Sequence, residues 1–194
     1  MTQNVEADEA NWMKSAARGD RSAFARIYER FKNPVMGYLK TLIQEERIAE
    51  ELAQETFLRA YRVRESYEPK AKVSTWLFTI AKNAAFDYLS KKKEANLLVI
   101  QDEEGSQMDP IERLESPILD SEAQLIEEVN RHAVEECLGE LTVKQREILG
   151  LRIFSDLSYE EISEQVQISL GSVKTHLYRA KEKLTACLKR GGHS

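Results

Sequence analysis

Apolar positions recur at helical spacing in both halves of this 194-residue chain. Near the C-terminus, apolar residues separated by four, three and four positions form one stripe along a predicted helix. The stripe consists of Val173, Leu177, Ala180 and Leu184. Two preceding helices are predicted to begin at Thr142 and Ser158, because each is followed three residues later by Gln or Glu, as in a capping box. Residues 141–188 are therefore predicted to form three helices that end in a helix-turn-helix.

The N-terminal half also has the pattern of helices. Asp20 is the predicted N-cap of a helix. Pro34 is expected to interrupt or kink this helix or to lie in the first turn of a new one, because proline lacks an amide donor and clashes with the preceding turn. A further helix is predicted over Glu46–Val63, followed by a charged loop without periodicity over 64–73. Ser74 is the predicted cap of the last helix in this half.

The predicted fold class is all-α, with two small helical domains. Residues 1–96 form the first domain, 97–124 a flexible acidic linker, and 125–190 a helix-turn-helix (winged-helix-like) DNA-binding domain. Many carboxylates and a single cation, Arg113, occur between positions 94 and 128. A segment of this charge, with scattered apolar residues, does not bury enough surface to form a core.

The last predicted helix carries polar and cationic residues opposite its apolar stripe. Because the stripe faces the domain core, these side chains face solvent, and such a helix can enter the major groove of DNA. An ordinary amphipathic helix with a solvated basic face is the alternative, but the capped helix and short turn just before it favour DNA binding. The candidate DNA contacts are Ser169, Gly171, Ser172, Lys174, Thr175, Tyr178 and Arg179.

Two blocks of the sequence resemble one known family. The motifs LTVKQREIL, LSYEEIS and LGSVKTHLYRAKEKL within 141–184 are similar to region 4 of bacterial sigma-70 family sigma factors of the extracytoplasmic-function group. EELAQETFLRAY (50–61) and STWLFTIAKNAAFDYLSKKK (74–93) are similar to region 2 of the same family, in the same order. Two matched blocks are more specific than one, and together they cover most of the chain.

The resemblance implies an RNA polymerase sigma factor, which binds core polymerase, reads the −35 and −10 promoter elements and helps to melt the DNA. It assigns −35 recognition to the helix-turn-helix. It assigns binding of the clamp helices of a large polymerase subunit to Glu51, Gln54, Glu55, Phe57, Leu58 and Arg59. The alternative is that Leu52 and Phe57 belong to the core and that Gln54 and Glu55 are plain surface.

Recognition and melting of the −10 element are expected within 64–93. Unstacking a base costs a few kcal/mol, so this segment must supply aromatic surface, polar edges and cations. The loop 64–73 would form the pocket for a flipped base, whereas Trp76 shares a stripe with Ile80 and is expected in the core. The candidate −10 residues are Tyr67, Lys70, Lys72, Lys82, Asn83, Asp87 and Lys91.

The charge balance predicts dependence on partners. The net charge is −5, although six cations against one carboxylate occur in 171–194. Non-specific DNA affinity comes mainly from cations on phosphates, so the free chain should bind DNA weakly and require core RNA polymerase. The resemblance also implies an anti-sigma factor that covers both DNA-facing surfaces. The acidic linker is either a solvated spacer or a segment that follows the nucleic-acid channel of polymerase.

Other functions find little support in the sequence. No Gly-rich phosphate loop, nucleophile elbow or metal motif occurs, so neither an enzyme nor a bound metal or cofactor is expected. A stand-alone regulator would need a receiver or ligand domain, which the N-terminal half does not resemble. Cys137 and Cys187 show no disulfide framework and are expected as small apolar residues in a reducing compartment. With no signal peptide or membrane-spanning apolar run, a soluble cytoplasmic protein is expected.

Overall fold

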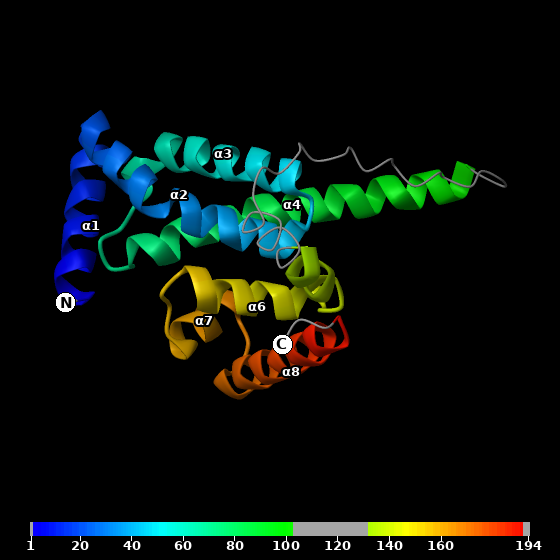
Figure 1. Cartoon of the computed structure of the whole chain (residues 1–194). Coiled ribbons are helices and arrows are strands. Elements are labelled where there is room, and N and C mark those ends of the chain that lie inside the picture. Colours follow the sequence, from blue (N-terminus) through cyan, green and yellow to red (C-terminus); the bar gives the residue numbers. More distant parts are fainter. Residues whose placement is uncertain (1, 103–131, 192–194) are drawn as a thin grey trace, which may run out of the picture.

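The computed structural model describes residues 2–102 and 132–191. Of the predicted linker, 97–102 form the end of a helix, and 103–124 lie outside the described residues. Helices α1 to α4 form an N-terminal bundle, and a C-terminal bundle packs beneath it (Figure 1). No strand occurs within the described residues, which confirms the all-α fold class. The elements are α1 (Thr2–Ala17), α2 (Arg21–Ile43), α3 (Glu46–Arg62), the short 3₁₀ helix η1 (Arg64–Ser66), α4 (Val73–Asp102), a helix over 132–139, α6 (Val143–Phe154), α7 (Tyr159–Val166) and α8 (Leu170–Arg190).

The predicted helix starts are mostly confirmed. The Asp20 carboxylate accepts hydrogen bonds from the backbone N–H groups of Ser22 and Ala23 and so caps α2. The Ser22 hydroxyl and the Ala23 N–H stabilise the carboxylate, which holds the pKa of Asp20 below its ordinary value. Complete capping boxes begin α6 at Thr142 and α7 at Ser158.

Two details of the N-terminal half correct the prediction. Pro34 neither interrupts the helix nor begins a new one, because α2 continues through it. Its neighbours Phe31 and Val35 are buried, and this core packing offsets the lost hydrogen bond. The prediction of Ser74 as a cap is wrong, because α4 begins at Val73 and the Trp76 N–H already donates to the Lys72 carbonyl.

The helix-turn-helix depends on a left-handed residue that is not glycine. Gln167 ends α7 with φ at 56°, and Asp156 has the same φ in the connection before α7. A non-glycine residue in this conformation costs on the order of 1 kcal/mol. The buried side chains of Ile162, Val166 and Val173 hold α7 and α8 together despite this strain.

Two glycines allow the bundles to approach closely at α2 and α6. A Cβ added to Gly37 of α2 would lie 2.7 Å from Cζ of Phe154, and one added to Gly150 of α6 would lie 2.9 Å from Cδ2 of Tyr38. Both distances are shorter than a normal carbon–carbon contact, so each helix has a notch that receives an aromatic ring of the other. Buried residues of both bundles consequently belong to one continuous apolar core.

The prediction of two unbonded cysteines is wrong. Cys137, in the helix over 132–139, forms a disulfide with Cys187 in the last turns of α8. The two residues are 50 positions apart in sequence, but the C-terminal bundle brings their Cα atoms to 5.6 Å, which is within the range for a disulfide. Sequence spacing alone does not reveal that these helices lie against each other.

We expect the disulfide to stabilise the C-terminal bundle. For a bridge across 50 positions, the loss of chain entropy in the unfolded state corresponds to about 4 kcal/mol as an upper value. Cys137→Ser should therefore lower the free energy of unfolding, measured by urea denaturation without reductant. Cys187→Ser and the double variant should lose the same amount, because either change removes the same bond. Equal stability of the wild-type chain with and without reductant would contradict the expected contribution.

Candidate nucleic-acid interface

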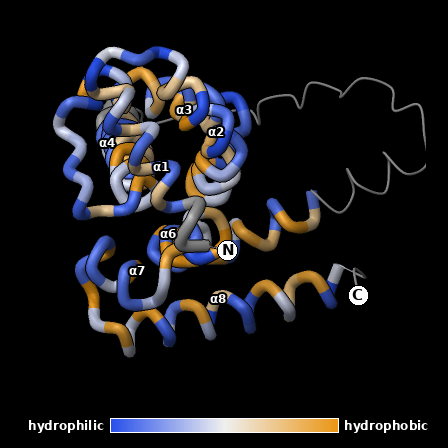
Figure 2. Tube along the Cα trace, turned by 90° about the vertical axis from the view of Figure 1, so that its left-hand side faces the viewer, coloured by the Kyte–Doolittle hydropathy of each residue, from blue (hydrophilic) through white to orange (hydrophobic). Residues whose placement is uncertain are grey.

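The outer face of α8 presents the predicted −35 residues together. α8 lies on the side of the C-terminal bundle away from the N-terminal bundle (Figure 2). Val173 and Ala180 are buried, whereas Tyr178 is 64% exposed. Solvent also reaches Gly171, Lys174, Thr175 and Arg179, which are all exposed. The predicted stripe and its opposite polar face are therefore both observed.

Two serines at the start of α8 support the helix itself. Ser169 is the N-cap, and its hydroxyl accepts a hydrogen bond from the Ser172 backbone N–H at 3.1 Å. The hydroxyls of Ser169 and Ser172 are 2.9 Å apart. Further along, the Thr175 hydroxyl donates to the Gly171 carbonyl, and the Glu182 carboxylate raises the pKa of Tyr178. The side chains of Lys174, Tyr178 and Arg179 are exposed and are therefore the best placed to reach a ligand.

The loop predicted to hold a flipped base borders a pocket of about 270 Å³. Its wall includes residues of α1, none of which belongs to the predicted −10 set. Tyr67 is largely buried, packs edge-to-face on Trp76 and donates its hydroxyl proton to the Ala71 carbonyl. The lining residues are Glu6, Ala7, Glu9, Ala10, Tyr67, Pro69, Lys70, Ala71, Lys72 and Val73.

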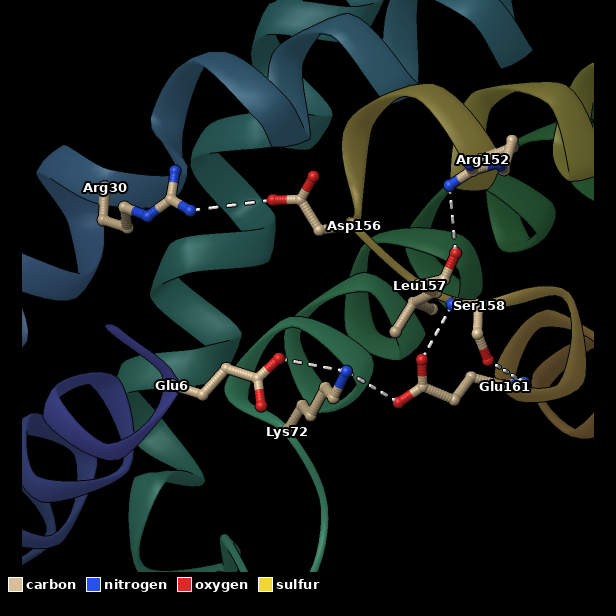
Figure 3. Close-up of polar contacts among 8 residues, drawn as sticks. All are labelled: Glu6, Arg30, Lys72, Arg152, Asp156, Leu157, Ser158 and Glu161. Carbon is tan, nitrogen blue, oxygen red and sulfur yellow. Dashed lines mark hydrogen bonds and ion pairs between the residues drawn. The ribbon is translucent and has the colours of Figure 1, made fainter. Parts of the chain in front are cut away.

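Two carboxylates of α1, those of Glu6 and Glu9, lie in the wall of this pocket. Glu9 is buried, and its carboxylate lies 3.1 Å from Nε of Arg30 in α2. Burial raises the pKa of Glu9 more strongly than the charge of Arg30 lowers it. Arg30 also lies 3.6 Å from Asp156 in the C-terminal bundle, as Figure 3 shows. The pocket region is thus connected to the neighbouring bundle by ionic contacts.

Two of the predicted −10 lysines do not face solvent freely. Nζ of Lys72 lies 3.1 Å from Oε1 of Glu6 and 3.0 Å from Oε1 of Glu161, and Figure 3 shows it between the two carboxylates. Hydrogen bonds with the Glu161 and Glu6 carboxylates raise the pKa of Lys72, and the bond with Glu161 has the larger effect. Nζ of Lys82 lies 3.3 Å from Oε1 of Glu147 and donates a hydrogen bond to the Gln165 carbonyl at 3.1 Å.

The other predicted −10 residues lie on the surface of α4 or its preceding loop. Lys70, Asn83, Asp87 and Lys91 are exposed. Asp87 lies 3.3 Å from Nη1 of Arg59, which joins the α4 surface to α3. The structure therefore separates the predicted set into exposed residues, the buried Tyr67, and two lysines bound by carboxylates.

A second polar surface runs along α3. Glu51, Gln54 and Leu58 are exposed and recur at helical spacing, while Glu55 accepts a hydrogen bond from Arg59 at 2.7 Å. This bond holds the pKa of Glu55 below its ordinary value. Leu58 is 53% exposed, so its apolar side chain lies on the surface between the polar residues of this stripe.

Phe57 occupies a different position from its neighbours on α3. Its ring is 7% exposed and packs edge-to-face against Tyr28 of α2, as the core alternative predicted. A groove of about 160 Å³ between α2 and α3 exposes part of this contact and is lined by Tyr28, Lys32, Met36, Glu50, Ala53, Gln54 and Phe57.

Within the described ranges, no group of three or more His, Cys, Asp or Glu side chains is arranged to hold a metal ion. The same part of the chain contains no helix long and apolar enough to cross a membrane. The candidate binding surfaces on the described residues are the α8 face, the α3 stripe and the pocket beside Tyr67.

Comparisons with known proteins identify the family. The model of sigma-70 region 2 matches residues 27–95, and that of sigma-70 region 4 matches residues 131–184. The ECF RNA polymerase sigma factor SigM of Bacillus subtilis (strain 168) is 34% identical over 165 residues, which are 85% of this chain and 94% of SigM. SigW of the same organism is 31% identical over 174 residues, which are 89% of this chain and 92% of SigW.

Solved structures share the fold. CnrH, in complex with the cytosolic domain of CnrY, aligns with a TM-score of 0.67 at 21% identity over 94% of this chain and 98% of CnrH. RpoE of Bartonella quintana, in complex with the anti-sigma factor NepR, aligns with a TM-score of 0.64 at 23% identity over 86% of this chain and 96% of RpoE. Both sigma-70 regions match in the expected order, and the relatives match over most of their length. The chain therefore belongs to the extracytoplasmic-function group of the sigma-70 family, the RNA polymerase sigma factors that direct promoter-specific transcription.

Proposed function

We propose that the exposed face of α8 reads the −35 element of promoters. The observation that carries this proposal is the solvent-facing cluster of Lys174, Tyr178 and Arg179 on the second helix of a helix-turn-helix. A helix of this kind places its N-terminal residues against base edges in the major groove. Ser169 and Ser172 cap the helix, so their contribution to DNA binding is positional.

The pocket beside Tyr67 and the neighbouring surface of α4 are proposed to bind the −10 element. The pocket volume of about 270 Å³ is large enough for one base, and Lys70 stands exposed at its wall. Further along α4, Asn83 and Lys91 are exposed and could meet the DNA strand. A flipped base would gain stacking and polar contacts that offset its unstacking.

The α3 stripe is proposed to bind core RNA polymerase. Leu58 is exposed between polar residues, and the groove between α2 and α3 adds an apolar depression beside Gln54. A mixed surface of this kind suits a helical partner, with an apolar anchor inside a polar rim. Sigma factors are non-enzymatic regulators of transcription, and we propose no catalytic residue, metal or cofactor for this chain.

An anti-sigma factor is proposed as a further partner, and the cytoplasm as the place of action. Support comes from the matched structures, in which CnrH is held by the cytosolic domain of CnrY and RpoE by NepR. We also propose that residues 1–96 and 125–190 act as two functional domains joined by a linker at 97–124.

Run-off transcription tests the proposed function. Purified core polymerase and the chain together should give defined transcripts from a library of genomic promoters, and neither component alone should give them. The recovered start sites would also return the −35 and −10 motifs. Formation of a stable holoenzyme that yields no defined transcript from any promoter would contradict promoter recognition by this chain.

Arg179→Ala should distinguish base contact from phosphate contact. If Arg179 forms a bidentate contact with a base, its removal should cost about 1–3 kcal/mol and relax specificity at one −35 position. If it binds phosphate alone, affinity should fall equally on all sequences and the salt dependence should become shallower. The measurement is holoenzyme binding to promoters with single −35 substitutions. Lys181→Ala is the control, since Lys181 is an exposed cation of α8 outside the proposed set. Unchanged binding by the Arg179 variant would remove this residue from the −35 site.

Leu58→Glu should weaken binding to core polymerase by about tenfold or more, because a buried anchor in an interface contributes at least 1–2 kcal/mol. The fold should not change, since Leu58 is already 53% exposed. Ile153→Glu is the matched control, because Ile153 is 57% exposed on α6 of the other bundle. Affinity for core enzyme is measured by fluorescence anisotropy of the labelled chain. Equal affinities of the two variants would contradict the α3 assignment.

A further inference from the structure

The pocket beside Tyr67 has two walls of opposite charge. One wall is the loop before α4, which contributes Lys70 and Lys72. The other wall is one turn of α1, which contributes Glu6, Ala7, Glu9 and Ala10. A nucleotide also has two chemically different ends, namely an anionic phosphate and a base with an edge of hydrogen-bond donors and acceptors. The charges of the walls therefore indicate how a flipped nucleotide would be oriented between them.

The lysine wall suits the phosphate. Lys70 is exposed, and Val73, which also lines the pocket, begins α4 at the positive end of the helix dipole. The α1 wall does not suit a phosphate, because the carboxylates of Glu6 and Glu9 would repel it. A nucleotide bound with its phosphate toward the loop would direct the edge of its base toward α1.

Of the two carboxylates on α1, that of Glu6 is accessible to a ligand. Glu9 is only 5% exposed, and its carboxylate accepts a hydrogen bond from Nε of Arg30 at 3.1 Å. The side chain of Glu6 is 45% exposed, and its Oε1 lies 3.1 Å from Nζ of Lys72, as Figure 3 shows. The ion pair holds the Glu6 carboxylate at the pocket. Because a carboxylate has about four lone-pair sites, Glu6 can still accept a hydrogen bond from a base.

We propose that Glu6 reads the flipped base by accepting a hydrogen bond from its exocyclic amino group, so that the pocket binds adenine, cytosine or guanine and disfavours thymine. Thymine is the one DNA base without such a group, and its keto oxygens would be repelled by a carboxylate, which can only accept. The inference rests on the proposed function, because it takes the pocket as the site of a −10 base. It adds a residue of α1 as the contact that determines specificity.

The reading residue lies outside the part of the chain that the family model matches. The sigma-70 region 2 model begins at residue 27, whereas α1 ends at Ala17. Two contacts nevertheless fix α1 on the bundle. Met13 is fully buried, and Nε of Arg64 in η1 donates a hydrogen bond to the Ala16 carbonyl at 3.0 Å. α1 is therefore held firmly enough to place Glu6 opposite the loop, which a base contact requires.

A purely structural role for Glu6 makes a different prediction. If Glu6 only holds Lys72 in place, its loss should weaken binding to all sequences alike, because an ammonium group binds phosphate whatever the base. If Glu6 reads an amino group, its loss should change the order of preferred bases at one position. Base preference therefore separates the two roles, whereas overall affinity does not.

Glu6→Gln is the test variant. The Gln amide has nearly the size and helix propensity of Glu, but it donates as well as accepts, so it can bond a keto oxygen. Asp8→Asn is the matched control, because this exposed carboxylate of α1 loses the same charge and does not line the pocket. Asp8 is two positions after Glu6 and so does not share its face of the helix. Circular dichroism verifies the helical content of both variants.

The measurement is the binding of holoenzyme to promoters recovered by run-off transcription, with each −10 position carrying A, C, G or T in turn. At one position, the wild type should bind thymine about tenfold more weakly than the preferred amino-bearing base, because a hydrogen bond to a charged group contributes at least this much. Glu6→Gln should reduce this ratio several-fold, and Asp8→Asn should leave it unchanged. An unchanged ratio in Glu6→Gln, or an equal loss on all sequences, would overturn the proposal.

Base analogues test the same contact from the side of the DNA. Purine replaces adenine, pyrimidin-2-one replaces cytosine and hypoxanthine replaces guanine, and each analogue lacks only the exocyclic amino group. At the position that Glu6 reads, the matching analogue should bind wild-type holoenzyme about tenfold more weakly than the natural base. Glu6→Gln should lose less affinity than the wild type does. Equal losses for the two proteins would show that Glu6 and the amino group are not coupled.

The same measurements separate this inference from the proposed function. If wild-type holoenzyme prefers no base at any −10 position, recognition of the −10 element by this chain fails. If it prefers particular bases and Glu6→Gln changes the preference at no position, only the role of Glu6 fails.

Discussion

The packing of α6 across α2 is the contact on which the rest of the arrangement depends. Phe154 and Tyr38 fit at Gly37 and Gly150, where any larger residue would hold the helices apart. This fit joins two helical bundles, distant in sequence, through one apolar core. It also sets the positions of Glu147 and Glu161 against the lysines of the other bundle. One steric match thus decides both the shape of the chain and which of its surfaces are covered.

Local sequence signals determined most of the secondary structure. The capping boxes at Thr142 and Ser158 and the N-cap at Asp20 act through hydrogen bonds within a few residues, so their positions are readable in the sequence. The apolar stripe of α8 likewise fixed which side of that helix is exposed. Pro34 and Ser74 were harder to interpret, because packing of the surrounding residues decides whether a helix continues through or begins before them.

Features that join distant parts of the chain were not readable in the same way. The disulfide between Cys137 and Cys187 depends on how the helix over 132–139 meets the end of α8. The part played by α1 in the pocket beside Tyr67 depends on the path of the first helix over the bundle. The ion pairs of Lys72 and Lys82 require both bundles to be in place. The seven residues predicted for −35 recognition lie on α8 or at its N-cap, so one local helical pattern groups them, whereas the predicted −10 residues depend on how a loop, α4 and the C-terminal bundle meet.

The distance between the two bundles tests the central claim most directly. Labels at Ser90 of α4 and Thr185 of α8, both exposed, would report this distance by pulsed electron paramagnetic resonance without disturbing the core. The free chain should show one short, narrow distance distribution, because the fit of α6 on α2 holds the two bundles in one arrangement. A broad distribution, or one centred at a long distance, would contradict this packing.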